Sequence, residues 1–373
     1  MKEKIILDDH SEAKVSLYSR YLSIYLNVLS RASIQNIFIV DFFCGEGVYE
    51  NDGKGSPIVA LECLKNHYFS NKNKCPNISI NFNDSLLSEI EPTKLKIDRV
   101  KEFARNIYKP DNVNISYTHF DYQELLNKIV LRTNKLSHSE RALLFIDPWG
   151  YKEIKANDLK ELLSNGKTEI ILFLPIYFMS RFAKKSKDES FKGGNALRNF
   201  IGELFGSINN LPHYDTQHQF IQLILQEFKK FLNLDYIDVF KIERDNNQWF
   251  ALYFFTSNKK GFVKMLESKW SIDKKNGYAY TQGDKHTLDI FDEITACGYD
   301  DKVLNFLLDK DGATNHELFE FGLKNNFLPK HTNQVIDKLK SNYTFEITSL
   351  DGKLARSSYL GDENRLVKIK IKV

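Results

Sequence analysis

Apolar residues follow two alternating patterns along the first half of the chain. Short apolar runs bounded by turn residues, such as NIFIVDFF at 36–43, are typical of buried strands. Between them, apolar residues recur three and four positions apart, which predicts amphipathic helices. We predict strands at 36–43, 78–82, 113–120, 141–150 and 168–176, and helices at 10–33, 56–69, 92–108, 122–133 and 155–165. This alternation predicts an α/β fold with a parallel sheet and helices on both faces.

After residue 176 the pattern changes. A charged stretch at 180–195 is predicted to be a mobile loop, and it is followed by helices at 196–206 and 218–233, a hairpin at 236–258 turning near Asp245–Asn247, and a helix at 260–270. An antiparallel hairpin that ends an otherwise parallel sheet is typical of the class I methyltransferase fold, whereas a dinucleotide-binding dehydrogenase continues with parallel units. We therefore expect a Rossmann-like sheet of seven strands over 1–275, with a helical insertion at 180–235.

The C-terminal part differs from the rest. A linker-like stretch at 273–286 precedes helical segments at 287–294, 300–309, 314–325 and 332–342 and short strands at 344–348 and 366–373. Helices followed by a β-ribbon suggest a winged-helix-like domain over 286–373. Modules of this kind contact nucleic acid or protein.

Composition narrows the class of protein. The 373 residues are 42% hydrophobic and carry a formal charge of +3, which is compatible with a polyanionic partner without indicating one. The four cysteines (Cys44, Cys63, Cys75 and Cys297) show no CxxC spacing and form no disulfide framework. With no secretory h-region and no run of about 18 apolar residues, we expect a cytoplasmic protein that does not enter a membrane.

The turn after the first predicted strand carries candidate chemistry. Asp41 is followed by Gly45 and Gly47, but Glu50 stands where a GxGxxG fingerprint would need a third glycine. Glu46 inside the turn would repel a pyrophosphate. An acid followed by a Gly-x-Gly turn suits a ligand with an ammonium group, such as the amino-acid part of S-adenosylmethionine. The alternative is an ordinary strand–helix turn.

The end of the fourth predicted strand carries a second candidate site. In LLFIDPWGY at 143–151, Asp147 and the Pro148 carbonyl are placed to accept hydrogen bonds from an exocyclic amine during methyl transfer. Trp149 or Tyr151 would stack on an extruded base. The alternative is a structural strand-to-loop exit. Both sites lie at the carboxyl edge of the predicted sheet, where open α/β sheets bind ligands.

The sequence resembles the three-Cys-motif partner protein family (TcmP). The resemblance rests on HSEAK at 10–14, VDFFCGEGVYENDGKGSPIVALECL at 40–64, LLFIDPWGY at 143–151, LPIYFMSRF at 174–182 and LYFFTSNKKGFVKMLESKW at 252–270, the last with a Thr-x-x-x-x-Gly turn. It implies a Rossmann-like methyltransferase domain related to the ribosomal large-subunit RNA methyltransferase J group, which methylates adenine N6. It also implies a partner protein with three cysteines and a mobile-element or antiphage context.

The resemblance also implies roles for single residues. His10 and Lys14 match the family's opening His and Lys, and Asp41, Gly45 and Gly47 match its cofactor turn. Gly55, Ser56 and Pro57 match its Gly-Ser-Pro loop, with Ser56 as an N-cap and cofactor contact. Asp121 stands near the place of the cofactor adenine, and Asp147, Pro148 and Trp149 match the catalytic strand end. Where the family carries a Glu for the ribose hydroxyls, this chain has Asn83 and Asp84, either of which can take that role.

Basic residues after the fifth strand are candidates for contact with a phosphate backbone: Arg181, Lys184, Lys185, Lys187, Lys192 and Arg198. A solvated loop is the alternative. Cys44 is expected to be a small packed residue, and no His, Cys or Asp spacing predicts a metal site.

We therefore expect an S-adenosylmethionine-dependent methyltransferase-like protein that acts on an exocyclic amine of a nucleic-acid base, adenine before cytosine. Two alternatives remain. One is a catalytically inactive partner or sensor subunit that binds S-adenosylmethionine or a nucleotide. The other is a nucleic-acid effector such as a nuclease, using Asp41, Asp121 and Asp147.

Overall fold

The chain divides into two compact units. The computed structural model describes residues 4–71, 75–148, 150–188, 190–244, 248–274, 277–281, 298–362 and 364–372. The first unit comprises Met1–Met265 with Tyr280–Gly283, and the second comprises Leu266–Ala279 with Asp284–Val373.

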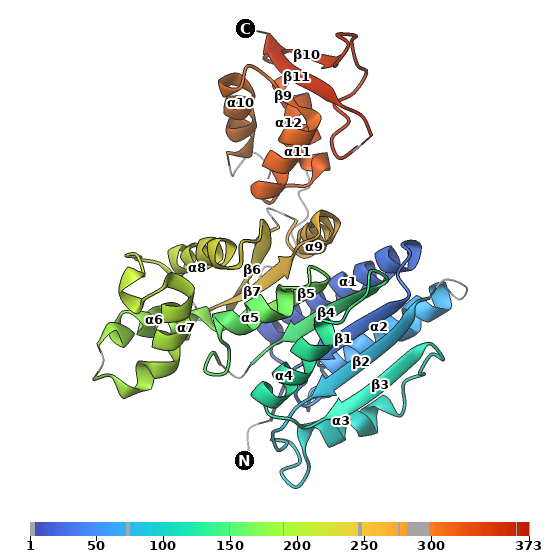
Figure 1. Ribbon diagram of the computed structural model, residues 1–373, viewed down its shortest axis with the longest axis vertical. Helices are drawn as coiled ribbons and strands as arrows, with labels where there is room; N and C mark the ends of the chain where they lie inside the picture. Colours follow the sequence, from blue (N-terminus) through green and yellow to red (C-terminus); the bar gives the residue numbers. More distant parts are fainter. Residues whose placement is uncertain are drawn as a thin grey trace. The chain divides into compact units, whose positions relative to one another are not determined.

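A mostly parallel sheet forms the centre of the first unit (Figure 1). Among the described residues it has eight strands in the order β3-β2-β1-β4-β5-β7-β6-β8. The strands are β1 (Asn36–Asp41), β2 (Asn77–Asn83), β3 (Val113–Thr118), β4 (Glu140–Ile146), β5 (Thr168–Leu174), β6 (Tyr236–Arg244), β7 (Gln248–Thr256) and β8 (Ala279–Thr281). The first five strands pair in parallel, and β7 pairs antiparallel with both β5 and β6. The predicted α/β class with a mostly parallel sheet is confirmed; the edge strand β8 was not predicted.

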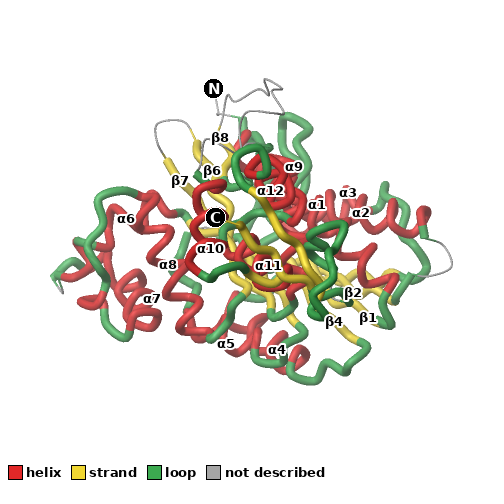
Figure 2. The backbone as a smooth tube through the Cα atoms, turned by 90° about the horizontal axis from the view of Figure 1, so that it is seen from above, coloured by secondary structure: helices red, strands yellow, loops and turns green. Residues whose placement is uncertain are grey.

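Helices cover both faces of this sheet. They are α1 (Asp9–Arg31), α2 (Ser56–Ser70), α3 (Lys96–Ala104), α4 (Tyr122–Thr133), α5 (Ala156–Leu163), α6 (Ile176–Ala183), α7 (Asn195–Phe205), α8 (Gln217–Leu232) and α9 (Lys259–Ile272). Figures 1 and 2 show α1, α2 and α3 on one face and α4 and α5 on the other. The apolar runs of β4 and β5 are therefore buried from both sides. On α1, the fully buried Tyr18 stacks on Phe145 with ring centroids 4.5 Å apart.

Three expectations about this unit need correction or lie outside the described residues. The segment 180–195 is not a loop throughout, because α6 runs to Ala183 and short 3₁₀ turns follow at Lys185–Lys187 and Lys192–Gly194. The helix predicted at 92–108 is shorter and spans Lys96–Ala104. The hairpin strands pair as predicted, but the turn predicted near 245–247 lies outside the described residues.

The second unit is a small helical domain with a β-sheet. Its elements follow in the order α10 (Tyr299–Asp309), β9 (Ala313–Thr314), α11 (Asn315–Lys324), α12 (Pro329–Leu339), β10 (Thr344–Ser349) and β11 (Val367–Lys372). The three strands form an antiparallel sheet in the order β10-β11-β9 among the described residues. Aromatic rings form its core, where Tyr299 stacks on Phe327 at 3.6 Å and Trp270 lies 5.6 Å from Phe327. The helix predicted at 287–294 lies outside the described residues.

Candidate cofactor and active site

The ends of β1 and β4 bring two acidic residues to the same edge of the sheet. The two strands are parallel neighbours, with Asp41 opposite Phe145, so Asp147 follows two residues beyond that pair. The chain leaves β1 toward β2 on one side, and β4 pairs with β1 on its other side. This is the point at which strand order reverses, where open α/β sheets bind ligands. Burial raises the pKa of Asp41, and the charge of Asp147 adds to this effect.

Asp41 is a buried carboxyl group, and only one of its two oxygens accepts a hydrogen bond from a described side chain. It is fully buried, and its Oδ2 accepts a hydrogen bond from the Ser56 hydroxyl at 2.5 Å. Oδ1 is buried as well and has no hydrogen-bond partner among the described residues. Burial raises the pKa of Asp41 to about 7, against the opposing effects of the Ser56 hydrogen bond and of the Phe43 backbone amide. A buried oxygen without a donor is costly, so this atom is suited to a ligand that brings a donor or a positive charge.

The turn after Asp41 has a backbone conformation that favours glycine, and Asp84 holds it in place. Gly45 and Gly47 have φ angles of +66° and +77°, which side chains rarely tolerate. A Cβ on Gly47 would lie 3.0 Å from Cγ2 of Val100. Asp84 accepts hydrogen bonds from the Gly45 amide at 3.0 Å and the Leu86 amide at 2.9 Å. Its carboxylate therefore fixes the turn, and contact with a ribose stays a prediction.

The side chain of Asn83, the other candidate for the ribose hydroxyls, forms hydrogen bonds within the protein. Its amide nitrogen donates to the carbonyls of Phe42 and Phe120, and its oxygen accepts from Thr118 and from the Phe120 amide. These bonds use both donors and both acceptor positions of the side chain. Of the two candidates, Asp84 is therefore the one with capacity for a ligand.

Glu46, inside the turn, is paired with other residues of the protein. Its carboxylate forms an ion pair with Arg99 and accepts hydrogen bonds from the Ser88 hydroxyl and the Glu89 amide, each at 2.7 Å. Both members of the ion pair are buried. The expected repulsion of a phosphate by Glu46 is therefore weaker than the sequence suggests, since Arg99 neutralises the charge.

Helix α1 places Lys14 against Asp147. The Lys14 ammonium forms an ion pair with Oδ2 of Asp147, and both side chains are mostly buried, with 12% and 18% of their surface exposed. The same ammonium lies 4.6 Å from the centre of the Phe173 ring at the end of β5. The aromatic face adds a cation–π interaction that keeps Lys14 in place.

His10 lies one turn earlier on α1 and is held in an aromatic stack. Its ring lies 5.1 Å from Phe250, which in turn stacks on Phe173 at 5.2 Å. Burial lowers the pKa of His10 to about 4, and the charges of Lys14 and Arg244 add to this effect. The imidazole is therefore neutral at pH 7. Its buried Nδ1 has no hydrogen-bond partner among the described residues.

Ser56 reaches the site by a different route from the one expected. Gly55, not Ser56, is the N-cap of α2, so Ser56 is the first helical residue and its hydroxyl donates to Asp41. Asp121 caps α4 by accepting from the Glu124 amide at 2.8 Å and is exposed. Pro57 occupies the first turn of α2 as predicted.

The loop after β4 is described only in part. The Pro148 carbonyl accepts a hydrogen bond from the Gly150 amide at 2.7 Å, which leaves one lone pair for a substrate. Tyr151 is half-buried, and Trp149 lies outside the described residues.

Other residues at this edge were not found from the sequence. Tyr49 is one, because its hydroxyl would lie 3.3 Å from a Cβ on Gly45. Burial and the nearby charge of Asp147 raise its pKa. Phe173 and Phe250 are two more such residues. For Phe173, an aromatic residue at the end of β5 was the sequence signal that could have identified it. The pKa of Glu153 is raised by desolvation and by the charges of Asp121 and Asp84.

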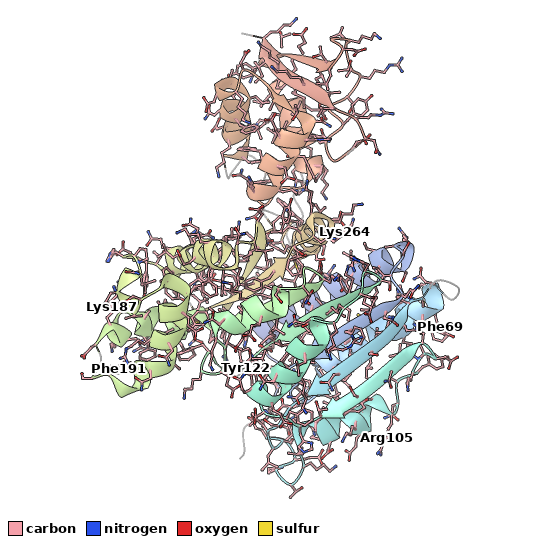
Figure 3. The ribbon with its side chains drawn as sticks, viewed as in Figure 1. Phe69, Arg105, Tyr122, Lys187, Phe191 and Lys264 are labelled. Atoms are coloured by element: carbon pink, nitrogen blue, oxygen red, sulfur yellow. The ribbon has the colours of Figure 1, made fainter. Side chains whose placement is uncertain are left out.

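The predicted basic set divides into two groups. Arg181, Lys184 and Lys185 are exposed and lie near aromatic rings, such as Lys184 at 4.9 Å from Tyr214. Arg198 instead donates to the carbonyls of Ser186 and Asp188 and to the Asn195 side chain. It therefore holds together the segment between α6 and α7, where Figure 3 labels Lys187 and Phe191.

In the part of the chain that the structure describes, no group of three or more His, Cys, Asp and Glu residues is arranged to hold a metal ion. Cys44 is buried, and burial raises the pKa of its thiol, as expected for a packed residue. No described helix combines the length and apolar character needed to cross a bilayer.

Comparison with known proteins gives weak structural similarity. No protein-family model matches the sequence, and no curated protein matches it. Among solved structures, a DUF519 protein from Legionella pneumophila is 12% identical, with a TM-score of 0.39 over 68% of this chain and 90% of its own. A DUF574 family protein from Streptomyces avermitilis is 8% identical, with a TM-score of 0.30 over 64% and 83%. Loganic acid methyltransferase with SAH is 12% identical, with a TM-score of 0.23 over 99% and 98%. Similarity at this level carries no argument about function.

Proposed function

We propose that the protein is an S-adenosylmethionine-dependent methyltransferase that acts on an exocyclic amine of a nucleic-acid base, adenine N6 first. The observation that carries the proposal is the buried, unpartnered Oδ1 of Asp41 beside a glycine turn. Asp84 and Asp147 add negative charge to the same region and raise the pKa of Asp41. A ligand with an ammonium and a sulfonium group would relieve this repulsion.

The order of the strands supports the same function. The order β3-β2-β1-β4-β5, completed by the antiparallel pair β7 and β6, is the arrangement expected for a class I methyltransferase. In this arrangement the cofactor lies at the carboxyl ends of β1 and its neighbours. Asp41, the glycine turn and Asp84 all lie at that edge.

The residues present fit S-adenosylmethionine, which would supply an electrophilic methyl group. Asp41 would hold its ammonium group, and the backbone at Gly45 and Gly47 allows close approach. Asp84 and Asp121 would face the ribose and adenine, as the TcmP resemblance implies. The Nδ1 of His10, which lies 3.8 Å from Oδ2 of Asp8 and has no hydrogen-bond partner among the described residues, would contribute an acceptor at the edge of the site.

Asp147 would orient the substrate amine. Lys14 occupies Oδ2, and Oδ1 accepts no hydrogen bond among the described residues. Oδ1 is therefore the atom to accept a hydrogen bond from the amine, with the Pro148 carbonyl as a second acceptor. Lys14 fixes the orientation of the carboxylate, so positioning supplies much of the rate. Trp149 or Tyr151 would stack on the base.

A nucleic-acid substrate is supported by the surface beyond β5. Helix α6 begins directly after β5, at the same edge of the sheet as Asp147. It carries Arg181 and leads to Lys184 and Lys185, whose aromatic neighbours are typical of surfaces that bind single strands. The order helix, strand, two helices and hairpin in the second unit supports a winged-helix domain that contacts nucleic acid or a three-Cys-motif partner.

A second candidate function is a subunit that binds S-adenosylmethionine without catalysis. The ion pair between Lys14 and Asp147 favours it, because the carboxylate needed for the amine already has a partner. Incubation with methyl-labelled S-adenosylmethionine and single-stranded DNA or RNA separates the two. Label in N6-methyladenine supports the enzyme. Binding of S-adenosylmethionine with no label in any nucleic acid, with and without the three-Cys-motif partner, supports the non-catalytic subunit.

A further inference from the structure

A pocket lies at the opposite edge of the sheet from Asp41 and Asp147. Its volume is about 220 Å³, and it is formed where β4 and β5 begin and β7 ends. The second half of α1 and the first turns of α9 form its walls, the latter including Lys264 (Figure 3). The proposed methyltransferase chemistry uses none of these residues.

A buried carboxyl group forms the base of this pocket. Glu169 accepts hydrogen bonds from the Tyr21 hydroxyl and, at 2.8 Å, from the Thr256 hydroxyl. A Cβ on Gly261 would collide with Oε1 of Glu169, so any larger residue there would displace the Glu169 carboxylate. The Thr-x-x-x-x-Gly turn noted in the sequence thus has a structural explanation, because its Thr256 and Gly261 both pack against Glu169.

The pocket is lined by more cations than acids. Arg141, Lys167, Lys260 and Lys264 line it, and Glu169 is the acidic side chain in the lining. Lys167 donates to the Leu136 carbonyl. Arg141 donates through Nη1 to two backbone carbonyls, and its Nη2 has no partner among the described residues. Lys260 is exposed at the start of α9. The lining therefore attracts an anion.

Tyr25 gives independent evidence for a ligand. Its side chain is buried, and its hydroxyl has no hydrogen-bond partner among the described residues. Burial raises the pKa of Tyr25, and the charges of Glu169 and Arg141 act on it in opposite directions, which places the hydroxyl near both. An unsatisfied buried hydroxyl is destabilising, so a ligand that accepts a hydrogen bond from it would remove a cost.

We propose that this pocket binds a small organic anion, a phosphomonoester or carboxylate attached to an apolar or aromatic group. The anionic group contacts Arg141 and Lys260 and accepts a hydrogen bond from Tyr25. The apolar part packs on Val28 and Leu29 of α1 and on Ala32 and Ile34 just after it. The pocket is smaller than the roughly 300–1,000 Å³ typical of drug-sized ligands, which favours a compact molecule.

Calorimetry of the full chain with phenyl phosphate and with benzoate tests the proposal and separates the two anionic groups. Saturable binding of at least one probe is expected. Tyr25→Phe and Arg141→Gln should each weaken it roughly ten-fold, the loss expected for one hydrogen bond to a charged group. Lys128→Gln on α4 is the control for loss of a charge elsewhere and should leave binding unchanged.

Two results would overturn the proposal. One is that neither probe binds saturably at concentrations up to about 10 mM. The other is binding that neither Tyr25→Phe nor Arg141→Gln alters, since it would take place at another site. Tyr25→Phe removes only one oxygen atom and keeps the ring, so the packing of α1 is retained. This variant therefore tests the proposal even if Arg141→Gln fails to fold. Binding of S-adenosylmethionine to Tyr25→Phe should match the wild type.

Discussion

Lys14 and Asp147 form an ion pair although 133 residues separate them in the sequence. The pair joins the first helix of the chain to the end of β4, and it lies beside the ring of Phe173. It orders the carboxylate proposed to receive the substrate amine. The pair also links two motifs, HSEAK and IDPWGY, that the sequence shows only as separate segments.

Loss of Lys14 should slow methyl transfer while sparing the cofactor. In Lys14→Met the Asp147 carboxylate loses its partner and its fixed orientation, so we expect the single-turnover rate to fall roughly 10- to 100-fold. Lys14→Arg should recover part of the rate, because Arg keeps the charge. Affinity for S-adenosylmethionine should change less than about threefold in both. Equal rates for wild type and Lys14→Met would show that the ion pair has no part in catalysis.

Replacement of Asp147 should separate binding from catalysis. Asp147→Asn keeps the shape of the side chain but removes the negative charge that strengthens the hydrogen bond from the amine. Single-turnover methylation should therefore fall at least about 100-fold. Calorimetry should show that S-adenosylmethionine still binds. Asp98→Asn, at an exposed ion pair with Lys101, is the control and should retain full activity. Retained activity in Asp147→Asn would place the amine acceptor elsewhere.

Affinity for S-adenosylmethionine should depend on pH through Asp41. Its pKa of about 7 in the free protein means that the carboxyl group is protonated below that pH and cannot pair with an ammonium. Affinity should therefore rise by up to about tenfold per pH unit toward pH 7, and fall above about pH 8 as the ligand's α-amino group loses its proton. Calorimetry across this range measures both limbs. Asp41→Asn should bind weakly at every pH, without the rise below pH 7.

The buried pair of Glu46 and Arg99 should be needed for stability. Arg99→Met leaves a buried carboxylate without its partner, which typically costs about 3–5 kcal/mol of unfolding free energy. The double variant Glu46→Gln with Arg99→Met removes both charges and should recover much of this loss. Urea unfolding measures all three proteins. A double variant no more stable than Arg99→Met would contradict the assignment of the loss to an unpaired charge.

The basic residues after α6 should contribute to nucleic-acid affinity. Lys184→Gln with Lys185→Gln should weaken binding of a single-stranded oligonucleotide and reduce the salt dependence of log K by about one to two units. The matched control is Lys128→Gln with Lys135→Gln near the end of α4, which should leave both quantities unchanged. Fluorescence anisotropy at several salt concentrations measures them. An equal effect of both double variants would indicate nonspecific attraction.

The sequence predicted the parts of the site that depend on local pattern. The exits of β1 and β4 were found because each apolar run ends in an acid at the edge of the sheet, and Asp41 and Asp147 do lie on neighbouring strands. Ser56 contacts the site through Asp41, although the N-cap role expected for it was wrong. Helix α6 was missed because it begins directly after an apolar strand and ends in a run of lysines, which hides its period.

Pairings between distant segments were beyond reach of the sequence pattern. Nothing local indicates that Arg99 lies opposite Glu46 or that Phe250 stacks on His10. The pocket around Glu169 is of the same kind, because its walls come from α1, β4, β5 and α9. Such sites depend on tertiary packing, which periodicity does not encode.

Calorimetry of the purified chain with S-adenosylmethionine near pH 7.5 tests the cofactor pocket most directly. We expect one site per chain, with affinity lost in Asp41→Asn and retained in Asp147→Asn. The absence of heat and of any co-purified S-adenosylmethionine in the wild type would contradict the pocket at the end of β1, and with it the proposed methyltransferase.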